Sequence, residues 1–349
     1  MLDLKNRAVP IIQAPMAGGV CPPGLVAAVC EAGGIGSFGF AYSTPEKIDQ
    51  DLTAVKALTK GCVNANFFLF RPVQSPPTEL EDAALQALMM LPVIGAEALP
   101  APLMPVPPFY PDLHAQLEPV WEHRPSLLTF HFGIAPAEVI NQARRLGISV
   151  GVTATSETEA LAIEQAGADF IVAQGIEAGG HRGFFDPEAA DEGLSTLELT
   201  RRLAKLSALP VVSAGGIMDG ADIAAALRAG AVAAQMGTAF LCCDESGASQ
   251  AHQRFVLTQG SRGSAVTRAF SGRPARGINN AFIELMQDKP VLPFPLQNSL
   301  TGPLRQWASK ADNGEFQSLW AGAQYSRARQ MPVADLVRTL MQEMQMALS

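Results

Sequence analysis

The sequence is poor in charged residues and contains no run of lysine or arginine. Only 17% of its 349 residues are Asp, Glu, Lys or Arg, and the formal net charge is −8. Nucleic acids are bound through their phosphates by a clustered basic surface, so this composition excludes a nucleic-acid partner. Any anionic ligand must instead be held by local backbone dipoles and a few chosen side chains.

Cysteine is also scarce. The five cysteines form no CxxC pair and no spacing typical of a metal site, and their odd number predicts a reduced, cytoplasmic protein. The first residues lack the charged-then-apolar order of a signal peptide. The most apolar long window, residues 91–110, contains six prolines, so it predicts an extended loop and no membrane helix.

Short apolar runs alternate with alanine-rich helical segments along most of the chain. This alternation predicts eight strands, at residues 8–16, 34–40, 62–70, 127–133, 148–154, 169–175, 209–217 and 231–241. Strands that alternate with helices form parallel sheets, and eight such units match the (β/α)8 or TIM barrel. A doubly wound open sheet is the alternative. We favour the barrel because glycine-rich loops follow the seventh and eighth strands.

Beyond residue 245 the regular alternation stops. Residues 1–245 predict the barrel, and residues 246–331 predict a small, mainly helical second domain that caps the active site. The segment from 71 to about 120 is rich in proline and predicts an irregular excursion. The last segment, 332–348, has helical apolar spacing, and we expect it to return to the barrel as its eighth helix.

Two glycine-rich loops occur where a TIM barrel commonly binds phosphate. Residues 213–220 read SAGGIMDG, and residues 235–238 read QMGT. Gly215 and Gly216 let backbone N–H groups approach a ligand, and Asp219 is placed to cap the following helix. The loops predict a phosphate cradle that uses no lysine; the alternative is that the glycines only make tight turns.

The sequence GIGSFG at residues 34–39 has the form of a dinucleotide-binding fingerprint. Its glycines fall within a predicted strand, whereas the fingerprint needs them after the strand and at the start of a helix. We therefore expect no nucleotide site at this position.

A few polar side chains are predicted at the carboxyl ends of the strands, where TIM barrels carry their active sites. Met16 follows the first strand, Asn66 ends the third and His131 the fourth, and Gln174 and His181 follow the sixth. Asn66 could contact a heterocycle or be structural, and a lone histidine such as His131 is more often a core residue. No cluster of ligands indicates a metal, and no serine or cysteine lies in a nucleophile elbow.

Several motifs, in this order, resemble those of the nitronate monooxygenase family, formerly called 2-nitropropane dioxygenases. They are IIQAPMAGG (11–19), HFG (131–133), QGIEAGGHRG (174–183), VVSAGGIMDG (211–220) and AAQMGTAF (233–240), and SGRPAR (271–276) resembles the family's continuation. The resemblance implies an FMN-containing TIM barrel. Such a protein oxidises alkyl nitronates, for example propionate 3-nitronate, with dioxygen to a carbonyl compound and nitrite.

The resemblance also implies roles for particular residues. His181 would be catalytic, and His131 would line the substrate pocket. The implied FMN contacts are Ala14, Met16, Asn66, Gln174, Gly179, Gly180, Ser213, Gly215, Gly216, Gln235, Met236, Gly237 and Thr238. Gly179 and Gly180 would let the backbone pass close to the flavin, and His181 would either remove an α-proton or position a nitronate anion. The oligomeric state is left open, with a homodimer as one alternative.

Two departures from the family concern the substrate. The chain has only three tyrosines, and residues 294–305 supply Phe294, Gln297 and Asn298 but no lysine, where relatives carry several tyrosines and a lysine. The main rival is an FMN-dependent enoyl reductase that uses NAD(P)H and has a similar Gly-Gly-His loop. A flavin-free barrel acting on a sugar phosphate and a flavoprotein that only binds its ligand are further alternatives.

Overall fold

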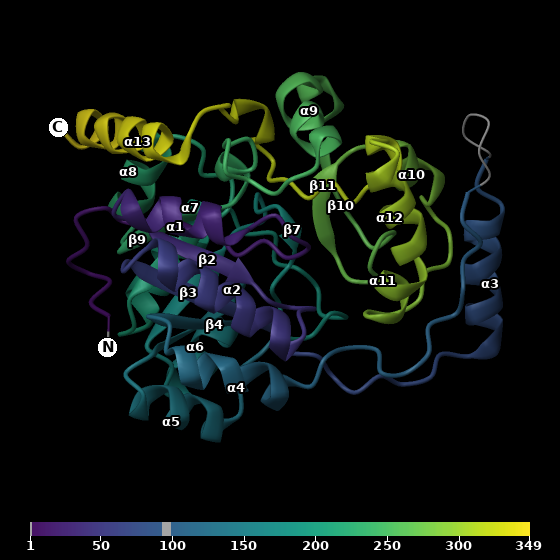
Figure 1. Cartoon of the computed structure of the whole chain (residues 1–349), viewed down its shortest axis with the longest axis horizontal. Coiled ribbons are helices and arrows are strands. Elements are labelled where there is room, and N and C mark those ends of the chain that lie inside the picture. The colour runs from purple at the N-terminus through teal and green to yellow at the C-terminus, as the bar shows by residue number, and fades with distance from the viewer. Residues whose placement is uncertain (1, 93–98) are drawn as a thin grey trace.

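The computed structural model describes residues 2–92 and 99–349 and contains a closed barrel of eight parallel strands (Figure 1). The strands are β1 (Ile11–Gln13), β2 (Ile35–Gly39), β3 (Cys62–Phe68), β4 (Leu127–His131), β5 (Ser149–Ala154), β6 (Phe170–Gln174), β8 (Val211–Ala214) and β9 (Ala233–Met236). They neighbour one another in this order, and β9 pairs with β1 to close the barrel. The expected TIM barrel is confirmed, and the open-sheet alternative is wrong.

Each strand lies within its predicted range, but the first and last strands of the barrel, β1 and β9, are shorter than expected. β1 has 3 residues, and β9 has 4 and is followed by a short 3-10 helix, η1 (Thr238–Phe240). Residues 238–240 are all buried, as most residues of the barrel strands are. Hydrophobic runs alone therefore could not separate this buried turn from the strand before it.

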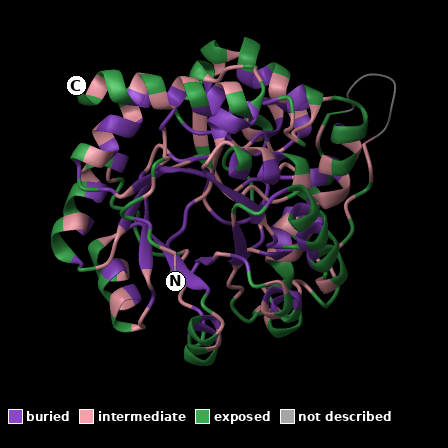
Figure 2. Ribbon diagram, turned by 60° about the vertical axis from the view of Figure 1, so that its left-hand side comes forward, coloured by how far each residue is buried: buried purple, intermediate pink, exposed green. Residues whose placement is uncertain are grey.

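Helices cover the outside of the barrel, with their exposed faces turned to solvent (Figure 2). They are α1 (Pro23–Glu31), α2 (Pro45–Leu58), α4 (Leu113–His123), α5 (Ala137–Arg145), α6 (Glu157–Gln165), α7 (Thr196–Leu206) and α8 (Gly220–Arg228). Side-chain caps start several of them, including Asp219, which accepts from the N–H of Asp222 at 2.9 Å as expected. α5 shows the amphipathic pattern, because its Val139, Ile140 and Ala143 side chains are buried on the face that packs on the barrel.

The segment between β3 and β4 is more regular than the sequence indicated. It contains α3 (Thr78–Met89) in addition to α4, so the expectation of an irregular excursion to about residue 120 is wrong. Prolines flank these helices, and one, Pro119, lies within α4, so the composition of the segment is that of a loop although the residues between the prolines are helical. Residues 99–110 do form no helix or strand, and residues 93–98 of the apolar window lie outside the described part of the chain.

The second region combines helices with a small sheet. It contains α9 (Gln250–Thr258), α10 (Ala281–Leu285), α11 (Leu296–Leu300) and α12 (Gly302–Lys310), with β10 (Ser264–Thr267) and β11 (Ala275–Ile278). Figure 1 shows α3 beyond α11 and α12, and its buried Ala84 and Leu88 share one apolar cluster with this region. Part of the chain before residue 245 therefore packs with the cap rather than with the barrel.

One short strand ties the second region to the barrel. β7 (Gly180–His181) belongs to the loop after β6, yet it pairs with β11 in an antiparallel sheet of order β10-β11-β7. In this register His181 lies opposite Ala275, and Gly180 lies opposite Arg276. The backbone of the glycine–histidine loop is thus fixed from the cap side.

The C-terminal helix α13 (Val333–Leu348) lies against the barrel. Val333, Leu336 and Leu340 are buried in the main apolar core, and the Glu343 carboxylate accepts from the N–H of Gly220 at the start of α8. Across the described residues, no helix is both long enough and apolar enough to cross a bilayer.

The GIGSFG pattern forms β2, a barrel strand. A Cβ added at Gly36 would lie 2.2 Å from the carbonyl oxygen of Val26, so glycine allows α1 to pack closely on this strand. Close packing between helix and strand accounts for this glycine.

Candidate active site

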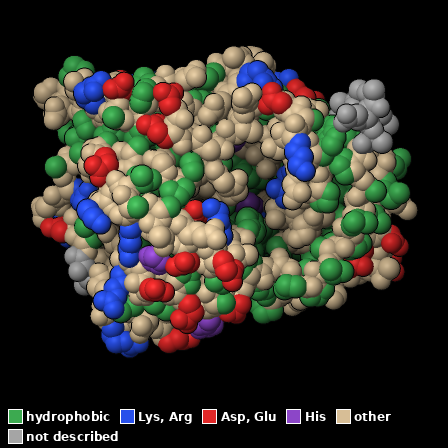
Figure 3. Space-filling model, viewed as in Figure 1, with side chains coloured by type: hydrophobic (Ala, Val, Ile, Leu, Met, Phe, Trp, Pro, Cys, Tyr) green, Lys and Arg blue, Asp and Glu red, His purple; other side chains and the backbone are tan. Residues whose placement is uncertain are grey.

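A cavity of about 800 Å³ lies at the carboxyl ends of the barrel strands, between the barrel and the second region. Figure 3 shows a hollow in this face of the molecule, with histidine and basic side chains visible inside it. Almost all residues expected to contact a cofactor or substrate line the cavity: Ala14, Met16, Asn66, His131, Gln174, Gly179, Gly180, His181, Gly215, Gly216, Gln235, Met236, Gly237 and Thr238. Its volume suits a cofactor-sized ligand together with a small substrate.

Ser213 is the exception among the expected site residues. It lies within β8 and is fully buried, and its Oγ is 2.8 Å from Oγ1 of Thr200 on α7. Successive side chains of a strand point to opposite faces, so Ser213 points toward the surrounding helix and not into the cavity. We therefore leave its side chain out of the proposed site.

The cavity wall carries an unusual charge pattern for so acidic a protein. Among the described residues that line it there is no aspartate or glutamate, and Arg305 is the one lysine or arginine. Arg182 and Arg273 are buried close behind the wall. Burial lowers the pKa of Arg273 to about 9, which leaves it charged at neutral pH. The cavity therefore favours an anionic ligand.

His181 extends from β7 into the cavity wall, and its ring has a defined partner. Nε2 lies 2.9 Å from Oγ of Ser271. The pKa of His181 lies well below its usual value, first because of burial and then because of nearby His131, Arg273 and Arg305. At neutral pH the imidazole is therefore uncharged and able to take up a proton.

His131 supports this loop from the end of β4. Its Nε2 is 3.2 Å from the carbonyl oxygen of His181, so Nε2 carries the hydrogen that is donated. Burial lowers the pKa of His131 to about 3, with the charges of Arg273 and Arg182 adding to the effect. His131 is thus a neutral hydrogen-bond donor that holds the backbone of the candidate catalytic histidine.

Aromatic rings surround the His181 imidazole. The ring centroids of Phe68, Phe132, Phe294 and Trp320 lie 5.6–5.7 Å from its own. These side chains restrict access of water to the imidazole, which is the physical cause of its lowered pKa. Except for Phe294, the sequence did not indicate them, because they come from segments that meet only in the folded chain.

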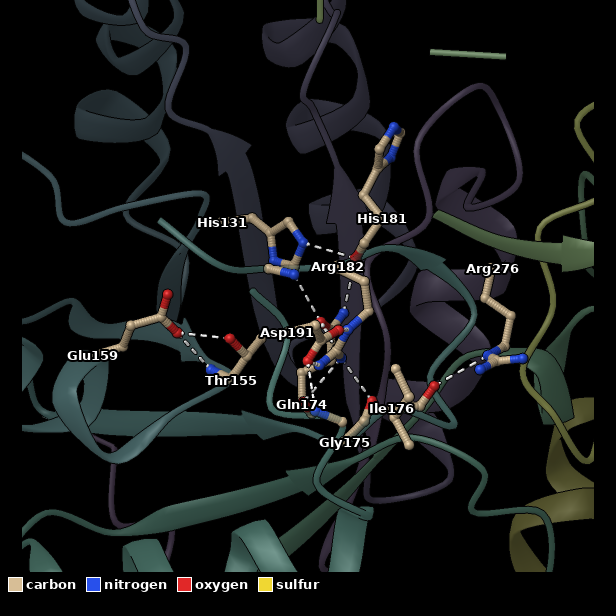
Figure 4. Close-up of polar contacts among 12 residues, drawn as sticks. His131, Thr155, Glu159, Gln174, Gly175, Ile176, His181, Arg182, Asp191 and Arg276 are labelled. Carbon is tan, nitrogen blue, oxygen red and sulfur yellow. Dashed lines mark hydrogen bonds and ion pairs between the residues drawn. The ribbon is translucent and has the colours of Figure 1, made fainter. Parts of the chain in front are cut away.

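The buried Arg182 side chain holds the loop that carries His181 (Figure 4). In the sequence, only its position next to His181 pointed to this residue. Its guanidinium donates to the backbone oxygens of Gln174 and Gly175, and it pairs with the Asp191 carboxylate at 2.7 Å. Gln174 Nε2 in turn donates to the carbonyl oxygen of His181 at 3.0 Å. The side-chain amide of Gln174 therefore both lines the cavity and holds the backbone of His181 in place.

Asn66 leaves one acceptor free at the cavity wall. Its Nδ2 donates to the backbone and side-chain oxygens of Thr129, at 3.2 and 3.0 Å. Thr129 then donates to Asn64 at 3.0 Å, which fixes the orientation of the Asn66 amide. Oδ1 of Asn66 has no partner among the described residues, so it is available to an N–H group of a ligand.

The two glycine-rich loops form a backbone cradle at one end of the cavity. Gly215 and Gly216 have φ of +124° and +65°, values that strongly favour glycine. In the described part of the chain, the N–H groups of Gly216 and Thr238 have no acceptor. Free amides on adjacent loops are suited to bind a phosphate.

The two glycines in the loop before His181 have different surroundings. A Cβ on Gly179 would lie 2.5 Å from the backbone of Ala321, so this glycine allows two protein segments to pack closely. Gly180 has φ of +74°, and a Cβ there would meet nothing within 4 Å. Both glycines line the cavity, and Gly180 has open space beside it, as the expected role requires.

A buried histidine, two glycine-rich loops with free amides and a cavity without an acidic side chain among its described lining residues lie together at the mouth of a TIM barrel, where such barrels carry enzyme active sites. The family model for nitronate monooxygenase matches residues 2–343. The chain is 42% identical to a nitronate monooxygenase of Paraburkholderia phytofirmans, over 100% of this chain and 95% of that protein. It is 43% identical to one of Pseudomonas aeruginosa, over 96% of each.

A solved structure agrees with these relatives. The nitroalkane oxidase of Streptomyces ansochromogenes superposes with a TM-score of 0.88 at 38% identity, covering 97% of this chain and 96% of that one. The chain therefore belongs to the nitronate monooxygenase family, a group of flavin-dependent oxidoreductases, and it is an enzyme.

Proposed function

We propose that this enzyme binds FMN in the cavity and uses it to oxidise alkyl nitronates with dioxygen, giving a carbonyl compound and nitrite. The observation that carries the proposal is the position of His181. It is a neutral imidazole in a cavity whose described lining residues include no acid, beside a backbone cradle suited to phosphate. Membership of the nitronate monooxygenase family supports the reaction class.

The residues present fit FMN. The free N–H groups of Gly216 and Thr238 would bind its phosphate, and Oδ1 of Asn66 would accept from an N–H of its ring system. Ala14, Met16 and Gly237 offer small or flexible surfaces against which a flat ring can lie. Thr238 Oγ1 accepts from the N–H of Gly322, which fixes the cradle to the second region.

The chemistry that FMN supplies when bound is electron transfer from the nitronate and reaction with dioxygen. The chain's own contribution is to bind and orient the substrate and to move a proton. With a neutral nitroalkane, the imidazole of His181 would remove the α-proton. With a nitronate, His181 and the positive field of Arg273 and Arg305 would position the anion. Phe68, Trp320 and the other rings around His181 would keep water from the reacting carbon.

The cysteines support the proposal of a reducing, cytoplasmic setting. All five thiols are free, and burial raises the pKa of Cys21 to about 12. Buried thiols of this kind are inert side chains of the core and not redox centres.

The proposed function is tested with the purified protein. Its visible spectrum is recorded first, and oxygen uptake and nitrite release are then measured with propionate 3-nitronate. NADH oxidation with an enoyl thioester is measured separately. We expect a flavin spectrum and nitrite formation coupled to oxygen uptake. A colourless protein that does not take up added FMN would refute the proposal, and NADH oxidation dependent on the thioester would favour an enoyl reductase.

A further inference from the structure

Arg273, in the segment between β10 and β11, is a buried cation that no carboxylate neutralises. It is 4% exposed and forms no ion pair among the described residues. Burial lowers its pKa to about 9, and the charges of Arg71 and Arg268 add to the effect. Glu159 and Asp186 counter it only from a distance. The charge of Arg273 is therefore set against its surroundings.

The two nearest acids are engaged by other groups. Glu159 accepts from the backbone N–H and the hydroxyl of Thr155, at 2.7 and 2.9 Å, and Asp186 pairs with Arg71 at 3.5 Å. An unneutralised buried charge costs stability, so the fold alone does not require an arginine at position 273. Residues that break a rule of folding in this way are expected where function needs them.

The guanidinium of Arg273 lies over the ring of Phe132. Its Cζ is 3.8 Å from the ring centroid, well within the range of a cation–π contact. Its polar bonds are few, since Nη2 donates to the carbonyl oxygen of Phe184 and the buried Nε has no partner in the described part of the chain. The contact with Phe132 is therefore a main interaction of this side chain.

Phe132 follows β4 and has a strained backbone. Its φ is +77°, in the left-handed region that residues with a side chain rarely adopt. Such a conformation persists only where the surroundings hold it, and it is typical of functional sites. The ring of Phe132 lies against both site histidines, with centroid distances of 4.7 Å to His131 and 5.7 Å to His181. Its position therefore bears directly on where the two imidazoles lie.

Arg273 reaches His181 through its backbone as well as through Phe132. Its carbonyl oxygen accepts from Oγ of Ser271 at 3.1 Å, and that Oγ lies 2.9 Å from Nε2 of His181. Neither Arg273 nor Phe132 is among the described residues that line the cavity, whereas His181 is. The arginine can therefore affect a bound substrate only through the groups that it holds.

We propose that Arg273 is a positioning residue of this active site: its guanidinium fixes the ring of Phe132, and that ring in turn fixes the imidazole of His181. The inference rests on the proposed function, because it assigns Arg273 a part in the same reaction. The charge of Arg273 acts in the same direction. Burial lowers the pKa of His181 most, and His131, Arg273 and Arg305 lower it further. The imidazole is thus held in place and in the form that accepts a proton.

A double-mutant cycle on the holoenzyme tests the inference, with a neutral nitroalkane as substrate. We expect Arg273→Met and Phe132→Leu each to lower kcat roughly 10-fold, and the double variant to lose little more than either one. Flavin content should stay at the wild-type level. Independent roles would instead give the product of the two losses, roughly 100-fold, and that result would overturn the inference. Wild-type kcat in either single variant would overturn it as well.

Phe184→Leu is the matched control for the ring. The Phe184 ring centroid is 5.9 Å from Cζ of Arg273, and among the described residues this ring has no contact with the imidazole of His181. Its loss should change kcat by less than about 3-fold, because only rings that hold His181 affect the base. A loss in Phe184→Leu equal to that in Phe132→Leu would contradict the proposed path.

Arg273→Lys separates the charge from the planar contact. It keeps the charge and loses the flat guanidinium, so kcat should fall while kcat/KM declines at the same low pH as in the wild type. In Arg273→Met the decline should move to higher pH, because a positive charge that disfavours the protonated imidazole is gone. A decline at the wild-type pH in Arg273→Met would overturn the inference.

Unfolding in urea distinguishes positioning from support of the fold. Arg182 is also buried behind the cavity wall, but Asp191 neutralises its charge. Arg273→Met removes a charge that nothing neutralises, so its urea midpoint should lie at or above that of the wild type. A fall in the midpoint as large as that of Arg182→Met would show that Arg273 supports the fold, and would overturn the inference.

Histidine NMR signals separate this inference from the proposed function. The imidazole signals of the enzyme as purified are recorded without substrate, and those of His181 are identified by their loss in His181→Asn. We expect one neutral tautomer in the wild type, and a mixture of tautomers in Arg273→Met and in Phe132→Leu. If the wild type oxidises no nitro compound, the proposed function fails while these signals still decide the role of Arg273. Identical His181 signals in the wild type and both variants would refute it.

Discussion

Nε2 of His181 lies 2.9 Å from Oγ of Ser271, and this contact determines which imidazole nitrogen carries the proton. The Ser271 hydroxyl donates its single hydrogen to the carbonyl oxygen of Arg273 at 3.1 Å. It can therefore only accept from His181, which places the hydrogen on Nε2. Nδ1 of the neutral ring is left as the basic nitrogen.

Ser271→Ala should impair proton removal without loss of the cofactor site. Without the acceptor, His181 is free to adopt the other tautomer or to rotate. We expect kcat with a neutral nitroalkane to fall roughly 10-fold, with flavin content unchanged. Ser309→Ala is the matched control, because Ser309 lines the cavity without a contact to His181. A Ser271→Ala enzyme with the wild-type kcat and pH profile would contradict this role.

The pH dependence should reflect the lowered pKa of His181. Because burial and the nearby positive charges disfavour its protonated form, the ring stays neutral when the pH falls from 7.5 through 6.5. We expect kcat/KM for a neutral nitroalkane to hold over this range and to decline only at lower pH. An inflection of kcat/KM at pH 6.5, the usual pKa of histidine, would show that the His181 imidazole is not buried among positive charges.

Arg182 should matter for stability more than its distance from the reaction suggests. Its side chain is 1% exposed, and its removal would leave Asp191 and the carbonyl oxygens of the loop without their donor. We expect Arg182→Met to lower the free energy of unfolding by roughly 3–5 kcal/mol in urea denaturation. Arg201→Met, at an exposed ion pair, should change it by less than about 1 kcal/mol. Similar losses of unfolding free energy in the two variants would contradict a stabilising role of the buried Arg182 contacts.

His252 should make the protein sensitive to acid. Burial lowers its pKa to about 4, and its buried Nε2 has no partner in the described residues. Because the unfolded chain binds this proton at about pH 6.5, stability is present above that pH and declines as the pH falls toward 4. Between pH 7.5 and 5 the contribution is on the order of 2 kcal/mol. His252→Gln should lose correspondingly less stability over this range, and an unchanged pH dependence would contradict the assignment.

The sequence predicted the barrel and the residues at its mouth because both follow from local patterns. Apolar runs separated by helices imply parallel strands, and the ends of those strands face one cavity. It did not indicate Ser271 as the partner of His181, nor Arg305 as a residue that lines the cavity. Both depend on where the second region folds back over the barrel, and no local periodicity encodes that contact. The close packing of Gly179 on Ala321 was not indicated for the same reason, since Ala321 is distant in the sequence.

The central claim is that His181 acts on the substrate within an FMN site, and His181→Asn tests it most directly. Flavin stoichiometry and kcat with a nitroalkane are measured on the same preparation, with His114→Asn as a control at an exposed histidine. We predict full FMN content and a fall in kcat of at least about 100-fold, as expected on loss of a general base. Wild-type kcat in His181→Asn with FMN bound would contradict the account.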